Sequence, residues 1–187
     1  MQSEGGKGGA GGGKAAAPAA AAGKKGAPGP GGVASPIDEE GALRIIQGVI
    51  TGKPDLAVAE QQLREAVSKV DPNPEGSAKG ANLKPVARAA WAAAVLGLSD
   101  LAEKWASRAA VSQELATRVW SDMARVHRGL QAVDKEKLAN VEASAMNAHA
   151  RAMEQLEDIV NTFSKMRDIE GVHEASRLIW NTGVDRL

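Results

Sequence analysis

From residue 36 onward, apolar residues recur every three or four positions, the spacing that places them on one face of an α-helix. In the first such run, Ser35 and Pro36 offer an N-cap and a first helical residue, and Gly52 and Pro54 end the pattern. The apolar positions between them are Leu43, Ile46, Val49 and Ile50. The sequence therefore predicts a first helix over 36–52.

A second helix is predicted to start at Asp55 and to end before Pro72 and Pro74, which open a loop reaching about Asn82. Its inward positions are expected to be Leu56, Ala59, Leu63, Ala66, Val67 and Val70.

The segment 83–110 is the most informative part of the chain. It predicts two short helices with their turn at Gly97 and with Ser99 as the N-cap of the second. Ala90, Ala102 and Ala109 occupy the small-residue positions of a tetratricopeptide-type hairpin. Units of this kind pack against neighbours of their own kind, which favours a scaffold over a catalyst.

The two hairpins are nevertheless not consensus repeats. Ala59 and Ala66 precede Ala102 and Ala109 by 43 positions, which exceeds the tetratricopeptide period of about 34 residues. The aromatic residue and the proline expected late in the second unit are also missing. We therefore expect tetratricopeptide-like packing.

The remainder, from Ser112 onward, is predicted to be almost continuously helical. Asp134 is expected to restart or cap the second of two long helices, and a break is expected around 168–171 before a last helix. The first long stripe is Leu115, Val119, Met123, Val126, Leu130 and Val133. The second is Val141, Ala145, Ala148, Ala152, Leu156, Ile159, Phe163 and Met166, on a helix of about 30 residues suited to close antiparallel packing or a short coiled coil. The last helix is expected to turn Val172, Ala175, Ile179 and Trp180 inward.

The predicted fold class is all-α, a solenoid of stacked antiparallel helical hairpins over residues 36–187, preceded by a tail over 1–35. One phenylalanine, no tyrosine and abundant alanine argue against strands. The tail is rich in glycine, alanine and proline and carries no acidic residue after Glu4, so we expect it to be disordered. Docking of its lysines onto an acidic surface and an organellar transit peptide are the alternatives, although arginine is absent and serine scarce. Gly8–Lys14 has the spacing of a phosphate-binding loop, but Ala15 replaces the required hydroxyl.

Charge and composition narrow the partners. The chain has 23 basic and 23 acidic residues, which argues against nucleic acid or a membrane surface as a partner. It has no cysteine, so disulfides and thiolate metal sites are excluded. Other proteins are the expected partners.

Candidate catalytic chemistry is nearly absent from the sequence. His127, His149 and His173 fall on separate helical segments and are expected at the surface or the rim, and His173-Glu174 lacks the second histidine of a zinc helix. We predict no catalytic, cofactor-binding or metal-binding residue, no cofactor, and no enzyme activity. The four tryptophans lie at or beside apolar stripes and are expected in the core: Trp91, Trp105, Trp120 and Trp180.

One motif brings a family into view. The segment Ser-Arg-Leu-Ile-Trp-Asn-Thr-Gly at 176–183 resembles a Leu-Trp-Asn segment of the cilia- and flagella-associated protein 46 family. Val184-Asp185 stands where that family commonly has Leu-Pro. The resemblance would span about Ile37–Leu187 and implies part of a large tetratricopeptide-containing component of the central apparatus of motile cilia. The implied location is cytoplasmic, in the axoneme, with microtubule contact that is at most indirect.

Taken together, the sequence predicts a non-catalytic scaffold of the axonemal central apparatus that supports motility through protein contacts. A cytosolic adaptor whose concave surface captures a peptide segment and an organellar helical protein are the alternatives. Because Leu178 and Leu187 have no predicted partner helix, we expect a piece of a longer array that self-associates through its last helix.

Overall fold

The computed structural model describes residues 36–78, 80–137 and 142–184, and every regular element in these ranges is an α-helix. The all-α prediction is confirmed for them. The helices are α1 (Pro36–Gly52), α2 (Leu56–Val70), α3 (Leu83–Val95), α4 (Ser99–Ala109), α5 (Leu115–Lys137), α6 (Glu142–Met166) and α7 (Ile169–Val184). The predicted tail over 1–35 lies outside the described residues.

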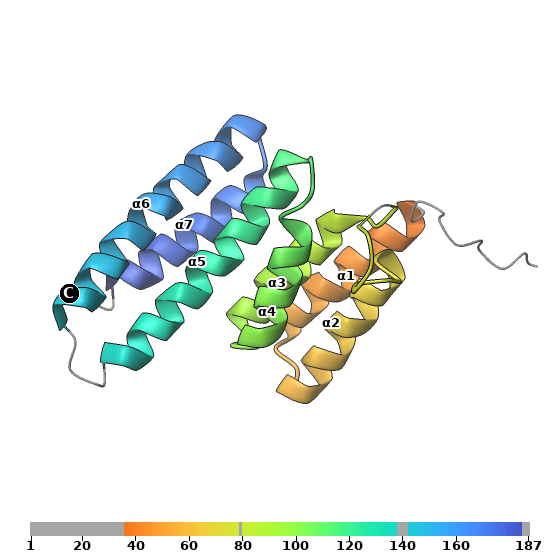
Figure 1. Ribbon diagram of the computed structural model, residues 1–187, viewed down its shortest axis with the longest axis horizontal. Helices are drawn as coiled ribbons and strands as arrows, with labels where there is room; N and C mark the ends of the chain where they lie inside the picture. The colour runs from red at the N-terminus through yellow and green to blue at the C-terminus, as the bar shows by residue number, and fades with distance from the viewer. Residues whose placement is uncertain (1–35, 79, 138–141, 185–187) are drawn as a thin grey trace, which may run out of the picture. The chain divides into compact units, whose positions relative to one another are not determined.

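The helices pack in a regular scheme. Each helix contacts the next one in the chain, and each odd-numbered helix also contacts the next odd-numbered helix. Within the described ranges, no such contact joins α2 to α4 or α4 to α6. Consecutive helices run in opposite directions, so that α1–α2, α3–α4 and α5–α6 form successive hairpins (Figure 1).

Helix α3 is the centre of the core. It contacts α1, α2, α4 and α5, and ten of its thirteen residues are buried. The predicted burial of Ala90, Ala102 and Ala109 is confirmed, since at most 1% of each is exposed. Alanine leaves room for neighbouring helix axes to approach closely, which is why one helix can carry four neighbours here.

The loop over 71–82 is attached to α4 through one arginine. Arg108 donates to both carboxylate oxygens of Asp71, from Nε to Oδ2 at 2.7 Å and from Nη2 to Oδ1 at 2.9 Å. It also donates to the carbonyl oxygens of Gly76 at 2.6 Å and Asn73 at 3.0 Å. The hydrogen bonds to Asp71 raise the pKa of Arg108. One guanidinium thereby satisfies the buried carboxylate and the loop backbone together.

The α3–α4 and α6–α7 turns share one backbone design. Gly97 has φ +76° and Arg167 has φ +59°. In each turn the next residue donates back across five residues, from Leu98 N to Ala93 O at 2.9 Å and from Asp168 N to Phe163 O at 3.0 Å. This is the Schellman arrangement, which satisfies carbonyls at a helix end through one left-handed residue.

Some expected inward positions are exposed. Leu56 and Leu115 are each the first residue of their helix, and about half of each is exposed. The apolar stripe continues to both, but the residues packed around the rest of the stripe do not cover these ends. Their predicted burial is therefore wrong, whereas the remaining predicted inward residues of α2 are buried.

Two predicted helix boundaries also need correction. Residue Leu98, not Ser99, precedes α4 as its N-cap and offers no side-chain cap. Helix α5 continues through Asp134 to Lys137, so the second long helix does not restart at that residue. Val141 lies outside the described residues.

Helix α7 is rotated relative to the prediction. Gly171, Ala175 and Leu178 are its buried residues, and Trp180 is 71% exposed. A Cβ on Gly171 would lie 2.5 Å from the Phe163 ring, so this close contact fixes which side of α7 faces inward. Trp180 follows Leu178 by two residues, about 200° around the helix, and must point outward. The predictions of a buried Trp180 and an exposed Leu178 are wrong, and Leu187 lies outside the described residues.

Candidate protein-binding groove

A hollow of about 810 Å³ opens between α1 and α7, with α3 at its base. Helix α1 contributes a line of side chains beside its buried stripe, α3 contributes two largely buried residues, and α7 contributes charged residues. We call this hollow the α1/α7 groove. The residues that line it are Glu40, Leu43, Arg44, Ile46, Gln47, Ile50, Thr51, Lys53, Arg88, Trp91, Glu170, His173, Glu174 and Arg177.

The sequence of α1 explains its wall of the groove. Ala42, Ile46 and Val49 form the fully inward stripe. Leu43 and Ile50 follow Ala42 and Val49 by one residue, about 100° around the helix, and are only partly buried. Two adjacent apolar stripes on one helix thus supply both the core contact and an accessible apolar wall.

The base of the groove is formed by packed aromatic rings and one arginine. The Arg88 guanidinium lies 3.7 Å from the centroid of the Trp120 ring and forms an ion pair with Glu170 of α7. Trp120 in turn donates from Nε1 to Asp168 Oδ2 at 3.0 Å, and its ring lies 6.4 Å from that of Trp91. Helices α3, α5 and α7 are therefore joined directly beneath the groove, which positions its two walls.

The charges of the groove are mostly paired within it. Its three glutamates each have an arginine partner: Glu40 pairs with Arg44, Glu170 with Arg88, and Glu174 with Arg177. Lys53 adds a further positive charge. An apolar wall bordered by charges of both signs is suited to a polypeptide segment, because peptides offer apolar side chains and charges together.

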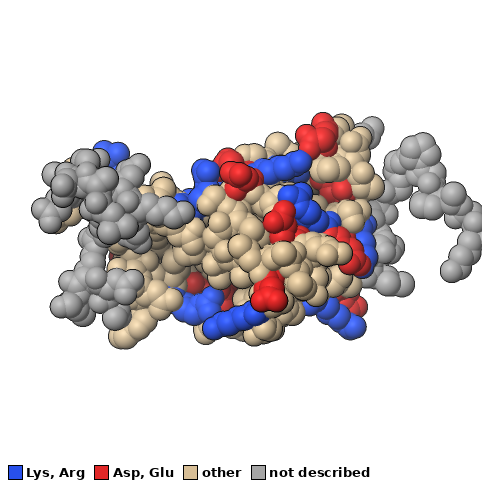
Figure 2. Space-filling model, turned by 90° about the horizontal axis from the view of Figure 1, so that it is seen from below, with Lys and Arg blue, Asp and Glu red and all other residues tan. Residues whose placement is uncertain are grey.

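One face of the described residues shows the same mixture. On the face seen in Figure 2, positive and negative side chains of the described residues are interspersed. Within the described residues, no group of three or more His, Asp or Glu is placed to hold a metal ion.

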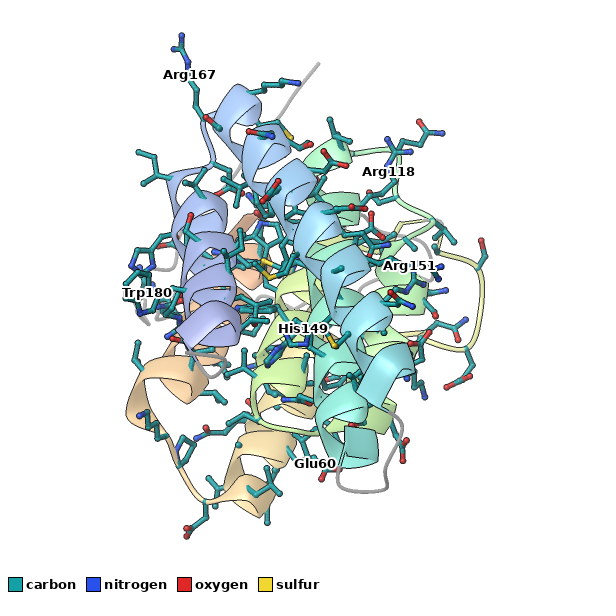
Figure 3. All side chains as sticks on the ribbon, turned by 90° about the vertical axis from the view of Figure 1, so that its left-hand side faces the viewer. Glu60, Arg118, His149, Arg151, Arg167 and Trp180 are labelled. Carbon is teal, nitrogen blue, oxygen red and sulfur yellow. The ribbon has the colours of Figure 1, made fainter. Side chains whose placement is uncertain are left out.

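The three histidines occupy three different environments. His149 is buried, 4% exposed, on the same stripe of α6 as Ala145 and Ala152 (Figure 3). His127 is partly buried, with its ring 5.4 Å from that of Trp91, and only His173 is exposed, on the rim of the groove. The surface prediction is therefore right for His173 and wrong for His149. The stripe spacing 145, 149, 152 was the signal that could have placed His149 inside.

Burial lowers the pKa of His127, and the positive charge of Arg177 lowers it further. Gln131 Nε2 lies 3.2 Å from His127 Nε2 and donates to the Ala94 carbonyl at 3.0 Å. His127 thus lies at the packed boundary of α3 and α5, where a second positive charge is unfavourable.

Sequence reasoning named no site residue, and the groove is what it missed. Trp91, Trp105 and Trp120 are buried as predicted. Nothing in the sequence, however, indicates that α1 and α7 line one hollow, because their groove residues lie more than 100 positions apart.

Comparison with known proteins shows similarity to a ciliary protein. No protein-family profile matches the chain. The chain is 58% identical over 158 residues, 84% of its length, to Cilia- and flagella-associated protein 46 of Chlamydomonas reinhardtii. It spans 6% of the length of that relative. The resemblance to the cilia- and flagella-associated protein 46 family is confirmed.

None of the helices in the described part of the chain combines the length and the apolar character needed to cross a membrane.

Proposed function

We propose that the chain is a non-catalytic, tetratricopeptide-like scaffold segment of the axonemal central apparatus of motile cilia or flagella. The identity to a cilia- and flagella-associated protein over 84% of the chain carries the ciliary part of this proposal. The scaffold part rests on the packing scheme, in which each helix contacts its successor and odd-numbered helices contact one another. That scheme is the one by which helical-hairpin repeats build extended binding surfaces.

Protein contact through the α1/α7 groove is the proposed mode of action. The groove combines the apolar wall of Leu43 and Ile50 with arginines on both sides, Arg44 from α1 and Arg177 from α7. A peptide segment would bury its apolar side chains against the apolar wall, and an acidic residue of the peptide would pair with one of these arginines. Support of motility is then mechanical, because the segment holds a neighbouring component in place.

The same groove keeps the adaptor alternative open. A peptide-capturing adaptor in the cytosol needs only this surface, whereas a central-apparatus scaffold must be retained in the axoneme. The location of the protein in the cell therefore distinguishes the two functions. A variant in the groove tests protein binding, which both functions require.

The experiment uses the Chlamydomonas relative, which contains a segment that matches this chain. In Chlamydomonas cells lacking that protein, a tagged version carrying this chain in place of the matched segment is expressed. We expect the tagged protein in isolated axonemes and restored swimming. Retention in the cell body with no axonemal signal would contradict the scaffold function and favour the adaptor.

The matched variants are Arg44→Glu and Arg64→Glu. Each arginine is exposed and pairs with a glutamate four residues earlier, Glu40 or Glu60, so each variant loses a similar surface ion pair, about 0.5 kcal/mol. Arg44 lines the groove and Arg64 lies on α2 outside it. Arg44→Glu should reduce axonemal retention several-fold and Arg64→Glu should not. Equal retention of both would show that the groove is not the contact.

A further inference from the structure

Among the described residues, the packing scheme leaves one side of helix α7 uncovered. Within the described residues, α3 contacts α1, α2, α4 and α5, and α5 contacts α3, α4, α6 and α7. Helix α7 packs on α5 and α6, and its Glu170 reaches Arg88 of α3 through an ion pair. The side of α7 opposite its contacts with α5 and α6 is uncovered in the described part of the chain.

That side of α7 carries an apolar ridge. Ile169 is 83% exposed and Trp180 is 71% exposed, and His173 lies between them. At about 100° per residue all three fall within about 40° of one another and opposite Gly171, Ala175 and Leu178. Figure 3 shows Trp180 directed away from α6. We call Ile169, His173 and Trp180 the α7 ridge.

The ridge is not a general consequence of lying at the edge of the packing. Helix α1 also has only two neighbours, α2 and α3. Its side opposite the buried stripe carries Glu40, Arg44 and Thr51, and among its described side chains no large hydrophobic one is exposed. Exposed apolar side chains gathered on one helix face indicate a contact surface.

We propose that the α7 ridge is the docking surface of an amphipathic helix that continues the array, with small apolar residues along its contact face. The inference rests on the tetratricopeptide-like array proposed above. Its model is α4, which packs on α3 with Ala102, Ala106 and Ala109 buried. Small residues admit the Trp180 ring between the two axes.

The source of this helix is the polypeptide outside the matched segment of the relative. This chain spans 6% of that protein, so most of the relative is available to cover the ridge. A further helix could cover the ridge through the same kinds of contact that join consecutive helices and odd-numbered helices in this chain. No new type of interface is needed.

The test measures binding of a defined probe. The probe is a separate polypeptide, as long as one helical hairpin, taken from the stretch that directly follows the matched segment in the Chlamydomonas relative. Calorimetry should detect its binding to the full chain, and hydrogen exchange should show new protection at the amides of 169–180. Trp180→Lys and, independently, Ile169→Lys should each weaken binding at least about tenfold.

Leu56→Lys and Val58→Lys are the matched controls, since both residues are exposed and apolar but lie on α2. They should leave binding unchanged. Because all four positions are exposed, the circular dichroism of each variant should equal that of the parent. Absence of binding, or binding that neither ridge variant weakens, would overturn the proposal.

Self-association is the competing occupant. If the parent chain sediments as a dimer that Trp180→Lys converts to a monomer, and the probe does not bind, the ridge pairs with a second copy and the proposed helix is wrong. Failure here leaves axonemal retention intact, and Arg44→Glu in the groove should not alter probe binding. The two proposals can therefore fail separately.

Discussion

The α2–α3 connection and the α6–α7 connection solve the same problem by different means. The first runs over residues 71–82 and is held from outside, by Arg108 of α4. The second consists of Arg167 and Asp168 and is held from within, by two backbone hydrogen bonds and by the Asp168 carboxylate. Asp168 accepts from the Gly171 N–H at 2.9 Å and from Trp120 Nε1 at 3.0 Å.

The difference shows how loop length sets the kind of stabilisation. A long connection leaves carbonyl groups that no helix satisfies, so a many-donor side chain from another helix is needed. A two-residue connection satisfies its own backbone, and its stability then depends on one left-handed residue and on close packing of Phe163 against Gly171. The stability of the α2–α3 connection should therefore be sensitive to removal of a charge, and that of the α6–α7 connection to an increase in side-chain volume.

The largest effect is expected from Asp71→Ala. This side chain is 2% exposed, and its loss leaves the Arg108 guanidinium, 12% exposed, without its carboxylate. The free energy of unfolding should fall by about 3 kcal/mol, measured by urea denaturation. The control Glu65→Ala removes an exposed pair with Lys69 and should cost no more than about 0.5 kcal/mol. Similar values for the two variants would contradict the clamp.

Volume should matter at the other junction. Gly171→Ala places a methyl group against the Phe163 ring and should cost about 2 kcal/mol. Gly48→Ala has open space around it in the middle of α1 and should instead stabilise by roughly 0.5–1 kcal/mol. Thermal unfolding of both variants gives the comparison. Stabilisation by Gly171→Ala would show that α7 does not pack as closely as described.

The left-handed residues give a smaller pair of effects with opposite signs. Arg167→Gly relieves a non-glycine residue at φ +59° and should raise stability by about 1 kcal/mol. Gly97→Ala places a Cβ at φ +76° in the equivalent turn and should lower stability by about 1 kcal/mol. Chemical denaturation of the two variants tests this, and changes of the same sign would be inconsistent with shared Schellman geometry.

The smallest effect concerns pH and the packed boundary between α3 and α5. The folded pKa of His127 lies below the ordinary value of 6.5, so the unfolded chain binds this proton first. Stability is therefore full above about pH 6.5 and should decline as pH falls through that value towards the lowered folded pKa. His127→Gln should flatten this part of the stability profile. An unchanged slope in His127→Gln would contradict this assignment.

Much of the fold could be predicted because helix formation and helix ends are local. Pro36, Gly52, the prolines after Asp71, and Gly97 all mark boundaries within a residue or two of those observed. The burial predicted from local spacing was wrong at the first residues of two helices, Leu56 and Leu115. It was also wrong in α7, where apolar residues lie on two sides of the helix and only one side is buried.

None of the groove could be predicted, because its geometry is a product of stacking. No sequence pattern links Arg88, Glu170 and Arg44, because they lie on three different helices. Only the packing of α1, α3 and α7 brings them to one hollow.

By itself, the sequence determined the helical class, the alanine-lined contacts of α3 and α4, and the family to which the chain is similar. These follow from residue types at fixed spacing, which act within a turn or two of helix. The tertiary structure decided the rotation of α7, the burial of His149, the engagement of Arg108 with a residue 37 positions away, and the α1/α7 groove. The physical reason is that an amphipathic stripe limits a helix's inward side only to within about 100°. A single close contact such as Gly171 against Phe163 then selects the orientation.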